Sequence, residues 1–183
     1  SFDIAYLTCL PGMVMMAASR DLISIFIALE LLSIPAYMMA AWRKGDARSN
    51  EAGVKYYLMG VFASAVMLYG MSLVYGIARS TQLDQIAPEI SGGDASPLLI
   101  IGILFTLLGF AFKVSAVPFH TWAPDTYEGA PTPVTAFLAV ASKAAGFVAL
   151  MTLIGAGFIV RGDVFQPLMW VLAALTMTIG NLL

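Results

Sequence analysis

Residues 56–78 read YYLMGVFASAVMLYGMSLVYGIA, which is 23 consecutive positions without a charged side chain. A helix rises about 1.5 Å per residue, and the hydrocarbon core of a bilayer needs about 20 residues to cross. This stretch is therefore long enough to span a membrane as a helix. It has no polar–apolar alternation of period two, which argues against a strand of a membrane barrel.

Similar apolar segments lie on both sides of this stretch. We predict a single membrane domain of about six transmembrane segments, at 4–19, 22–42, 52–78, 97–127, 131–157 and 164–183. The fourth is too long for one simple span, and we expect it to break near Pro118, because a proline interrupts the helical hydrogen bonds. The sequence thus predicts an all-α, polytopic transmembrane helix bundle. Its ends suggest an internal fragment of a longer subunit.

The composition excludes several other classes of protein. Of 183 residues, 60% are hydrophobic and 11% are charged, whereas soluble domains carry about 25% charged residues. A soluble globular domain and a disordered chain are excluded, and the single cysteine, Cys9, rules out a disulfide scaffold. The formal net charge is −2 without a basic patch, so no nucleic-acid partner is expected. The expected surroundings are a lipid bilayer. The basic residues around 43–55 place that connector in the cytoplasm.

Three charged residues, Glu30, Lys113 and Lys143, fall inside predicted spans. A charge at the centre of a membrane helix costs about 2.5–3.5 kcal/mol, so such residues generally mark a functional site. Buried lysines next to a movable carboxylate can take up and release protons. We therefore predict that Glu30 and Lys113 form a switchable pair and that Lys143 is the next proton acceptor. The alternative is a buried ion pair that fixes helix register.

Other polar residues receive weaker assignments. His120 follows Lys113 by seven residues, and its imidazole suits a proton relay, although it could equally cap the broken helix. Glu51 and Lys55 have the i,i+4 spacing of a helical ion pair at the membrane edge. The sequence contains no P-loop, zinc-protease, hydrolase or dinucleotide motif, so we expect no metal and no cofactor in this chain.

Several motifs resemble one known family. The stretch 109–147, GFAFKVSAVPFHTWAPDTYEGAPTPVTAFLAVASKAAGF, resembles the antiporter-like subunits of respiratory complex I, the proton-pumping NADH:quinone oxidoreductase, and subunit N in particular. The stretches 28–37, ALELLSIPAY, and 51–65, EAGVKYYLMGVFASA, are similar to the same family. The resemblance extends over nearly the whole chain.

The resemblance implies a fold of two inverted five-helix repeats, each with one broken helix. This chain would supply the first repeat and the start of a further helix. Glu30, Lys113 and Lys143 match residues that carry protons in this family, and His120 matches a histidine beside the helix break. A further lysine of the family would lie beyond position 183.

The resemblance also implies what surrounds the chain. FMN, iron–sulfur clusters and quinone would be bound by partner subunits, and the redox energy would reach this chain from them. The expected partners are other membrane subunits of complex I, namely the antiporter-like subunit M and small subunits such as K and J. The expected location is the inner (plasma) membrane of a bacterium, with the mitochondrial inner membrane as the alternative.

Two other functions remain open from the sequence. The first is the same fold in a sodium/proton antiporter or a membrane hydrogenase. The second is a scaffold that holds a membrane arm together, in which Glu30 and Lys113 are an inert pair.

Overall fold

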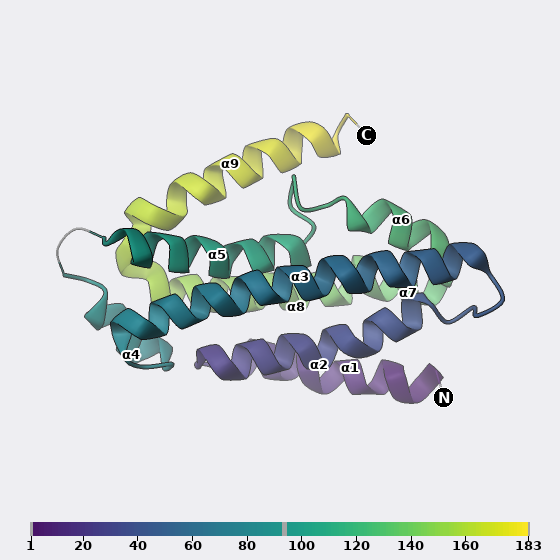
Figure 1. Cartoon of the computed structure of the whole chain (residues 1–183), viewed down its shortest axis with the longest axis horizontal. Helices are drawn as coiled ribbons and strands as arrows, with labels where there is room; N and C mark the ends of the chain where they lie inside the picture. The colour runs from purple at the N-terminus through teal and green to yellow at the C-terminus, as the bar shows by residue number, and fades with distance from the viewer. Residues whose placement is uncertain (1, 93–94, 183) are drawn as a thin grey trace.

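The computed structural model describes residues 2–92 and 95–182, and within these ranges every regular element is a helix. The predicted all-α class is confirmed for the described residues. Positions 93–94, in the connector before 97, and position 183, the last of the sixth predicted segment, lie outside them. The long helices run roughly side by side along the molecule (Figure 1).

Three helices form the first part of the bundle. Helix α1 (Phe2–Ala18) packs on α2 (Leu22–Ala40), and α3 (Ala47–Ala78) follows. Asp21 caps α2 by accepting the Ser24 amide at 3.0 Å, and Asp46 caps α3 in the same way. A Cβ atom on Gly12 would lie 2.7 Å from the Leu32 backbone nitrogen, so a glycine is what allows α1 and α2 to approach so closely.

The next helices lie against α3. The short α4 (Leu83–Glu89) is followed by α5 (Pro97–Lys113), which Ser96 caps through the Leu99 amide. Helix α5 packs along α3 (Figure 1). At Gly70 the two backbones nearly touch, because a Cβ atom there would lie 2.5 Å from the Thr106 nitrogen.

The helix that begins at Pro97 ends at Lys113. Residues 114–121 form a non-helical segment that contains Pro118, and α6 (Trp122–Gly129) then begins. We call residues 114–121 the break. The Trp122 indole Nε1 donates to the Phe112 carbonyl at 3.0 Å, which joins the first residue of α6 to the end of α5 across the break.

The last part of the chain turns back over the bundle. Helix α7 (Thr132–Ala139) and α8 (Ala141–Thr152) are separated at Val140, within the segment predicted at 131–157. A π-helical stretch (Leu153–Phe158) and a short 3-10 helix (Ile159–Arg161) lead into α9 (Gly162–Gly180). Figure 1 shows α9 lying on the outside of the bundle, next to α5.

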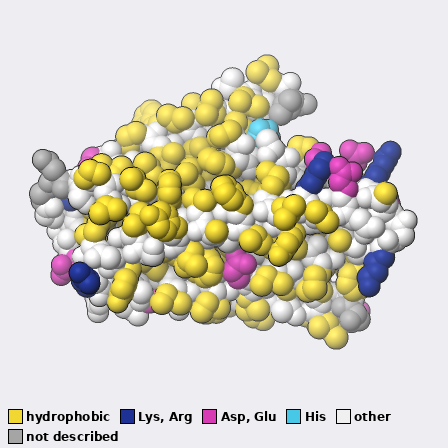
Figure 2. Space-filling view, viewed as in Figure 1, with side chains coloured by type: hydrophobic (Ala, Val, Ile, Leu, Met, Phe, Trp, Pro, Cys, Tyr) yellow, Lys and Arg dark blue, Asp and Glu magenta, His cyan; other side chains and the backbone are white. Residues whose placement is uncertain are grey.

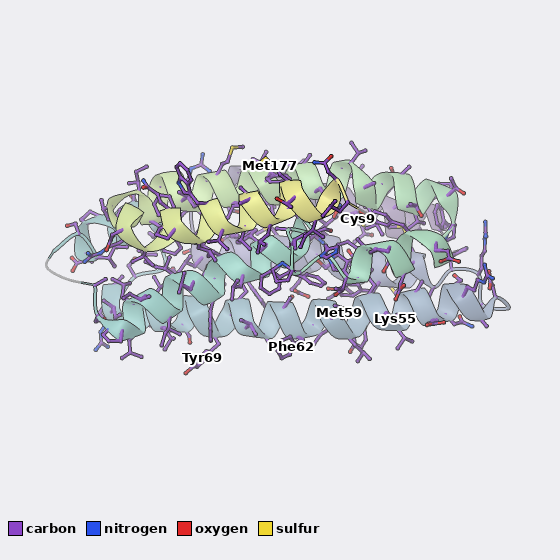
Figure 3. The ribbon with its side chains drawn as sticks, turned by 90° about the horizontal axis from the view of Figure 1, so that it is seen from above. Cys9, Lys55, Met59, Phe62, Tyr69 and Met177 are labelled. Atoms are coloured by element: carbon purple, nitrogen blue, oxygen red, sulfur yellow. The ribbon has the colours of Figure 1, made fainter. Side chains whose placement is uncertain are left out.

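The surface has the character expected of a membrane protein. Among the described residues, three helical stretches are long and apolar enough to cross a membrane: Leu22–Ala40, Ala47–Ala78 and Thr132–Gly180. Hydrophobic side chains spread over the middle of the face in Figure 2, and most of the charges visible there lie toward the two ends. Phe62 and Tyr69 of α3 point away from the bundle (Figure 3), with 72% and 57% of their surface exposed. In a bilayer these side chains face lipid or other subunits rather than water.

Candidate functional site

The site is centred on Lys113, the last residue of α5. Its side chain is buried, with only 3% of its surface exposed. Its Nζ donates a hydrogen bond of 2.9 Å to the Ser33 hydroxyl of α2. That hydroxyl in turn donates to the Leu29 carbonyl at 2.6 Å, which leaves its lone pairs directed at the ammonium. The charged group is therefore held by a neutral partner whose orientation α2 fixes.

Glu30 lies close to Lys113 but does not contact it. Glu30 is half-buried on α2, and its Oε1 accepts a hydrogen bond of 2.5 Å from Ser64 of α3. Within the described residues no ion pair of 4.0 Å or less joins it to Lys113. Ser33, Ser64 and Lys113 line one small cavity of about 10 Å³, close to the volume that a single water needs. Each member of the predicted pair thus bonds to a serine hydroxyl, and no direct ion pair joins the two.

Lys143 lies on α8, which packs against the end of α5. A Cβ atom on Gly146 would lie 3.3 Å from both Lys113 Cγ and Val114 Cγ1, so α8 contacts the stem of Lys113 at this glycine. Lys143 is three residues earlier, about 4.5 Å along the helix axis. Its Nζ lies 5.4 Å from the centre of the Tyr127 ring, within the range of a cation–π contact. The two lysines therefore lie on neighbouring parts of facing helices.

An aromatic cluster connects the surroundings of the two lysines. From Tyr127 beside Lys143, the ring of Trp122 is 6.0 Å away, and Trp122 stacks on Tyr56 at 4.5 Å with an angle of 14° between the planes. Tyr56 contacts Tyr37 edge to face at 4.7 Å, and Tyr37 lines the cavity beside Lys113. The cluster thus runs from one lysine to the cavity of the other.

Several buried polar atoms of this region have no hydrogen-bond partner within the part of the chain that the structure describes. They include the hydroxyls of Tyr56, Thr126 and Tyr127 and the Nδ1 atom of His120. Buried polar groups without a protein partner are generally satisfied by ordered water. His120 lies in the break and is half-buried, and no described hydrogen bond or ion pair joins it to Lys113.

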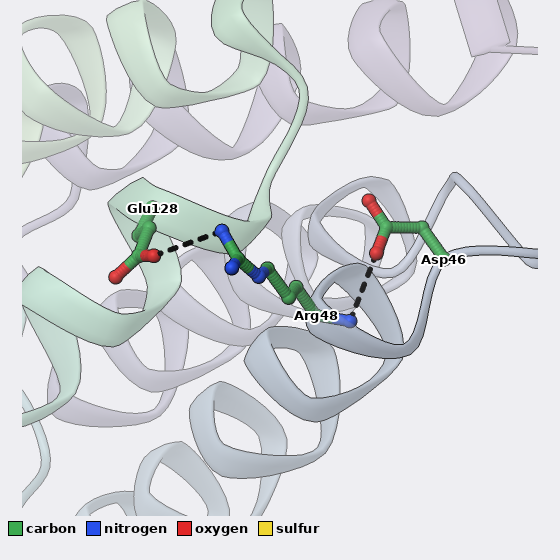
Figure 4. Close-up of polar contacts among 3 residues, drawn as sticks. All are labelled: Asp46, Arg48 and Glu128. Carbon is green, nitrogen blue, oxygen red and sulfur yellow. Dashed lines mark hydrogen bonds and ion pairs between the residues drawn. The ribbon is translucent and has the colours of Figure 1, made fainter.

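Ion pairs tie α6 to the beginning of α3 at one end of the bundle. Arg48 pairs with Glu128 at 3.3 Å (Figure 4), and Lys55, seen at the surface in Figure 3, contacts Asp125 at 2.6 Å. Lys55 also contacts Glu51 at 2.6 Å, which confirms the predicted i,i+4 pair. All these side chains are exposed, and surface pairs of this kind contribute about 0–1 kcal/mol each. Their effect is to orient α6 rather than to carry the chemistry.

The arrangement suits proton transfer more than bond-making chemistry. Glu30 and Lys113 each bond to a serine hydroxyl, a group that can both donate and accept hydrogen bonds. Among the described residues, no cluster of three or more His, Cys, Asp and Glu side chains could hold a metal ion.

The charged residues stand out in the sequence, whereas the side chains that bond to them do not. Ser33 follows Glu30 by three residues and so shares its helix face, a spacing that could have indicated it. Ser64 offered no such signal, because it bonds to a residue of another helix.

Comparison with known proteins identifies the family of the chain. Residues 19–183 match the family described as NADH:quinone oxidoreductase/Mrp antiporter, transmembrane. The chain belongs to this family. It is therefore a multi-pass membrane protein, as its apolar helices also indicate.

Within the family, curated proteins similar to this chain are named subunit N. NADH-quinone oxidoreductase subunit N of Trichlorobacter lovleyi is 47% identical over 172 residues, which are 93% of this chain and 35% of that protein. The predicted similarity to subunit N is confirmed. This chain spans about a third of the length of the curated relatives that it matches.

Solved structures of the family share the fold. Respiratory complex I from Thermus thermophilus with bound aureothin contains a chain that is 39% identical, with a TM-score of 0.73, over 82% of this chain and 33% of that one. A chain of the membrane-bound sulfane sulfur reductase, an archaeal respiratory membrane complex, is 28% identical with a TM-score of 0.83, over 94% of this chain and 34% of that one.

Proposed function

We propose that this chain is part of a proton-translocating membrane subunit of NADH:quinone oxidoreductase, in which Glu30, Lys113, Lys143 and His120 transfer protons. The observation that carries the proposal is the environment of Lys113. Its ammonium is fully enclosed, is bonded to a hydroxyl, and has a carboxylate nearby without a direct ion pair. An inert structural lysine would be expected to pair directly with the carboxylate, because an unpaired buried charge is costly.

The proposed relay has two parts. In the first, Glu30 and Lys113 influence each other across Ser64 and Ser33, so that movement of the carboxylate changes how firmly Lys113 holds its proton. In the second, Lys113 exchanges a proton with Lys143. The unpartnered hydroxyls of the aromatic cluster support a wet route between them, since they can bind water.

The wider assembly follows from the family. Because the chain covers about a third of its relatives, the activity of the whole subunit is itself part of the proposal. In it, FMN, the iron–sulfur clusters and quinone belong to partner subunits, and the chain contacts the antiporter-like subunit M and small subunits such as K and J. The bacterial sources of the relatives favour the plasma membrane of a bacterium, and nothing supports the mitochondrial alternative.

The test is Lys113→Ala in the complete subunit, assembled in its complex in inverted membrane vesicles. Proton pumping, measured with a pH-sensitive dye and divided by the rate of NADH oxidation, should fall well below wild type. Lys44→Ala removes an exposed lysine and serves as the matched control. Wild-type pumping by an assembled Lys113→Ala complex would show that Lys113 does not carry protons.

A sodium/proton antiporter is the second candidate, because the matched family includes the Mrp antiporters. The two functions separate by ion dependence. Pumping that continues in vesicles freed of sodium supports the proton relay, and pumping that requires sodium supports the antiporter.

A further inference from the structure

Four backbone amides of the break bond to backbone carbonyls close by in the chain. They bond to carbonyls of α5 or of the break itself: Val114 to Phe110 at 2.9 Å, Ser115 to Phe112 at 3.0 Å, Ala116 to Ala111 at 2.8 Å and Phe119 to Ala116 at 2.7 Å. The Val117 amide differs. It donates to the Thr176 hydroxyl of α9 at 2.9 Å, so a side chain of another helix holds the middle of the break.

The Thr176 hydroxyl is oriented for this role. It donates its own proton to the Leu172 carbonyl one turn earlier in α9, at 2.6 Å. Because a hydroxyl has one donor and two acceptor positions, this bond leaves its lone pairs free to accept the Val117 amide. Val117 is buried, with 4% of its surface exposed, so an amide without this partner would be costly.

Little else fixes α9 against the break. An apolar groove of about 280 Å³ lies between them and α8, and its lining includes Val114, Ala116, Phe147 and Thr176. Within the described part of α9, only Val164 and Leu172 are buried, with 8% and 7% of their surface exposed. Loose apolar packing does not define a position well, so the hydrogen bond is the contact that sets where α9 meets the break.

We propose that Thr176 is a positioning residue: through the Val117 amide it sets the conformation of the break and so the placement of Lys113 and His120. Val117 is four residues after Lys113 and three before His120, so a shift of α9 is transmitted to both. Movement of the helix that follows the repeat would in this way reach the relay. This inference rests on the proposed function of Lys113. It identifies Thr176 as a residue through which α9 would influence proton transfer by Lys113.

The experiment compares three variants of the complete subunit in its assembled complex. Thr176→Val keeps the shape and removes the hydroxyl, and Thr176→Ser restores a hydroxyl. Thr178→Val is the matched control, because Thr178 is exposed on the same helix and bonds only to the Ala174 carbonyl within α9. Hydrogen–deuterium exchange of peptides covering 114–121 measures how readily the backbone hydrogen bonds of the break open. The number of protons pumped per NADH oxidised measures the activity of the relay.

Loss of one hydrogen bond should speed exchange of the break about five-fold in Thr176→Val, with a parallel fall in protons pumped per NADH. Thr176→Ser and Thr178→Val should match wild type in both measurements. Unchanged exchange in Thr176→Val would overturn the inference, and so would faster exchange with an unchanged pumping ratio.

Lys113→Ala in the same preparations separates the two proposals. If Lys113→Ala loses pumping while Thr176→Val retains it, the inference about Thr176 fails alone. If Lys113→Ala retains pumping, the proposed function fails and the inference with it.

Discussion

Replacing Gly146 by alanine tests the contact between α8 and Lys113. The new Cβ atom would lie 3.3 Å from Lys113 Cγ and from Val114 Cγ1, which is a few tenths of an ångström closer than an ordinary carbon–carbon contact. Because the Lys113 side chain is enclosed, the added methyl must displace its stem.

The size of the effect follows from the bond at the other end of that side chain. The Lys113–Ser33 distance is 2.9 Å, and such bonds extend to about 3.2 Å before they weaken. A displacement of a few tenths of an ångström is enough to reach that limit. If it costs the worth of one hydrogen bond, about 1 kcal/mol, a proton-transfer step that depends on this bond should slow about five-fold, and proton pumping per NADH oxidised should fall.

The measurement is proton pumping in inverted vesicles, normalised to NADH oxidation and to the amount of assembled complex. Gly155→Ala is the control, because its Cβ atom would meet nothing within 4 Å. Alanine favours helix over glycine by about 1 kcal/mol, so a weakened α8 would not explain a loss of pumping. Full pumping by an assembled Gly146→Ala complex would refute the reasoning.

Two further predictions concern stability. Gly70→Ala should lower the thermal unfolding temperature of the detergent-solubilised subunit, since its Cβ would lie 2.5 Å from the α5 backbone and such overpacking costs about 1–3 kcal/mol. Gly76→Ala is the control, because its Cβ would meet nothing within 4 Å, and it should leave the unfolding temperature unchanged. Equal unfolding temperatures for the two variants would contradict the close approach of α3 and α5 at Gly70. Burial alone raises the pKa of Asp21, but hydrogen bonds from Thr81 and from the Ser24 amide outweigh it and hold the pKa below its ordinary value of 3.8. A carboxylate with a lowered pKa stabilises the fold at higher pH and loses this effect as the pH falls through the folded-state pKa. The protection of the Ser24 amide against exchange, relative to its intrinsic exchange rate, should therefore fall below about pH 4 in wild type more than in Asp21→Asn, and an identical pH dependence would rule the effect out.

The class of fold could be predicted because a membrane helix is recognisable from its own continuous stretch of sequence. An uncharged run as long as 56–78 is best explained by a transmembrane helix. Burying a charge in such a helix is costly, which marks Glu30 and Lys113 as candidate functional residues. The motif 109–147 was specific enough to indicate the family, which the comparisons confirm.

The partners of the charged residues could not be predicted because they depend on packing between distant segments. Ser33 and Lys113 are 80 residues apart, and nothing local to either indicates that α2 meets the end of α5. The same holds for Thr176 and Val117, which are 59 residues apart. A serine or threonine in an apolar helix most often bonds to its own backbone, so the few that act on another helix do not stand out.

The residue at which α5 ends also could not be predicted from the local sequence. The sequence indicated an interruption near Pro118, but the helix already ends at Lys113, five residues earlier. Residues 114–116 close a compact turn whose amides return to α5, and Ser115 adopts a left-handed conformation with φ of 58°. Such turn geometry depends on the chain around it more than on the proline itself.

The central claim is that buried acid–base groups carry protons here, and the most direct measurement removes them without leaving a buried charge. Glu30→Met with Lys113→Met replaces both by apolar side chains of similar length in the assembled complex. If the groups form a relay, NADH oxidation can continue while protons pumped per NADH fall. If the chain is a scaffold, the double variant will pump as wild type, and the account will be contradicted.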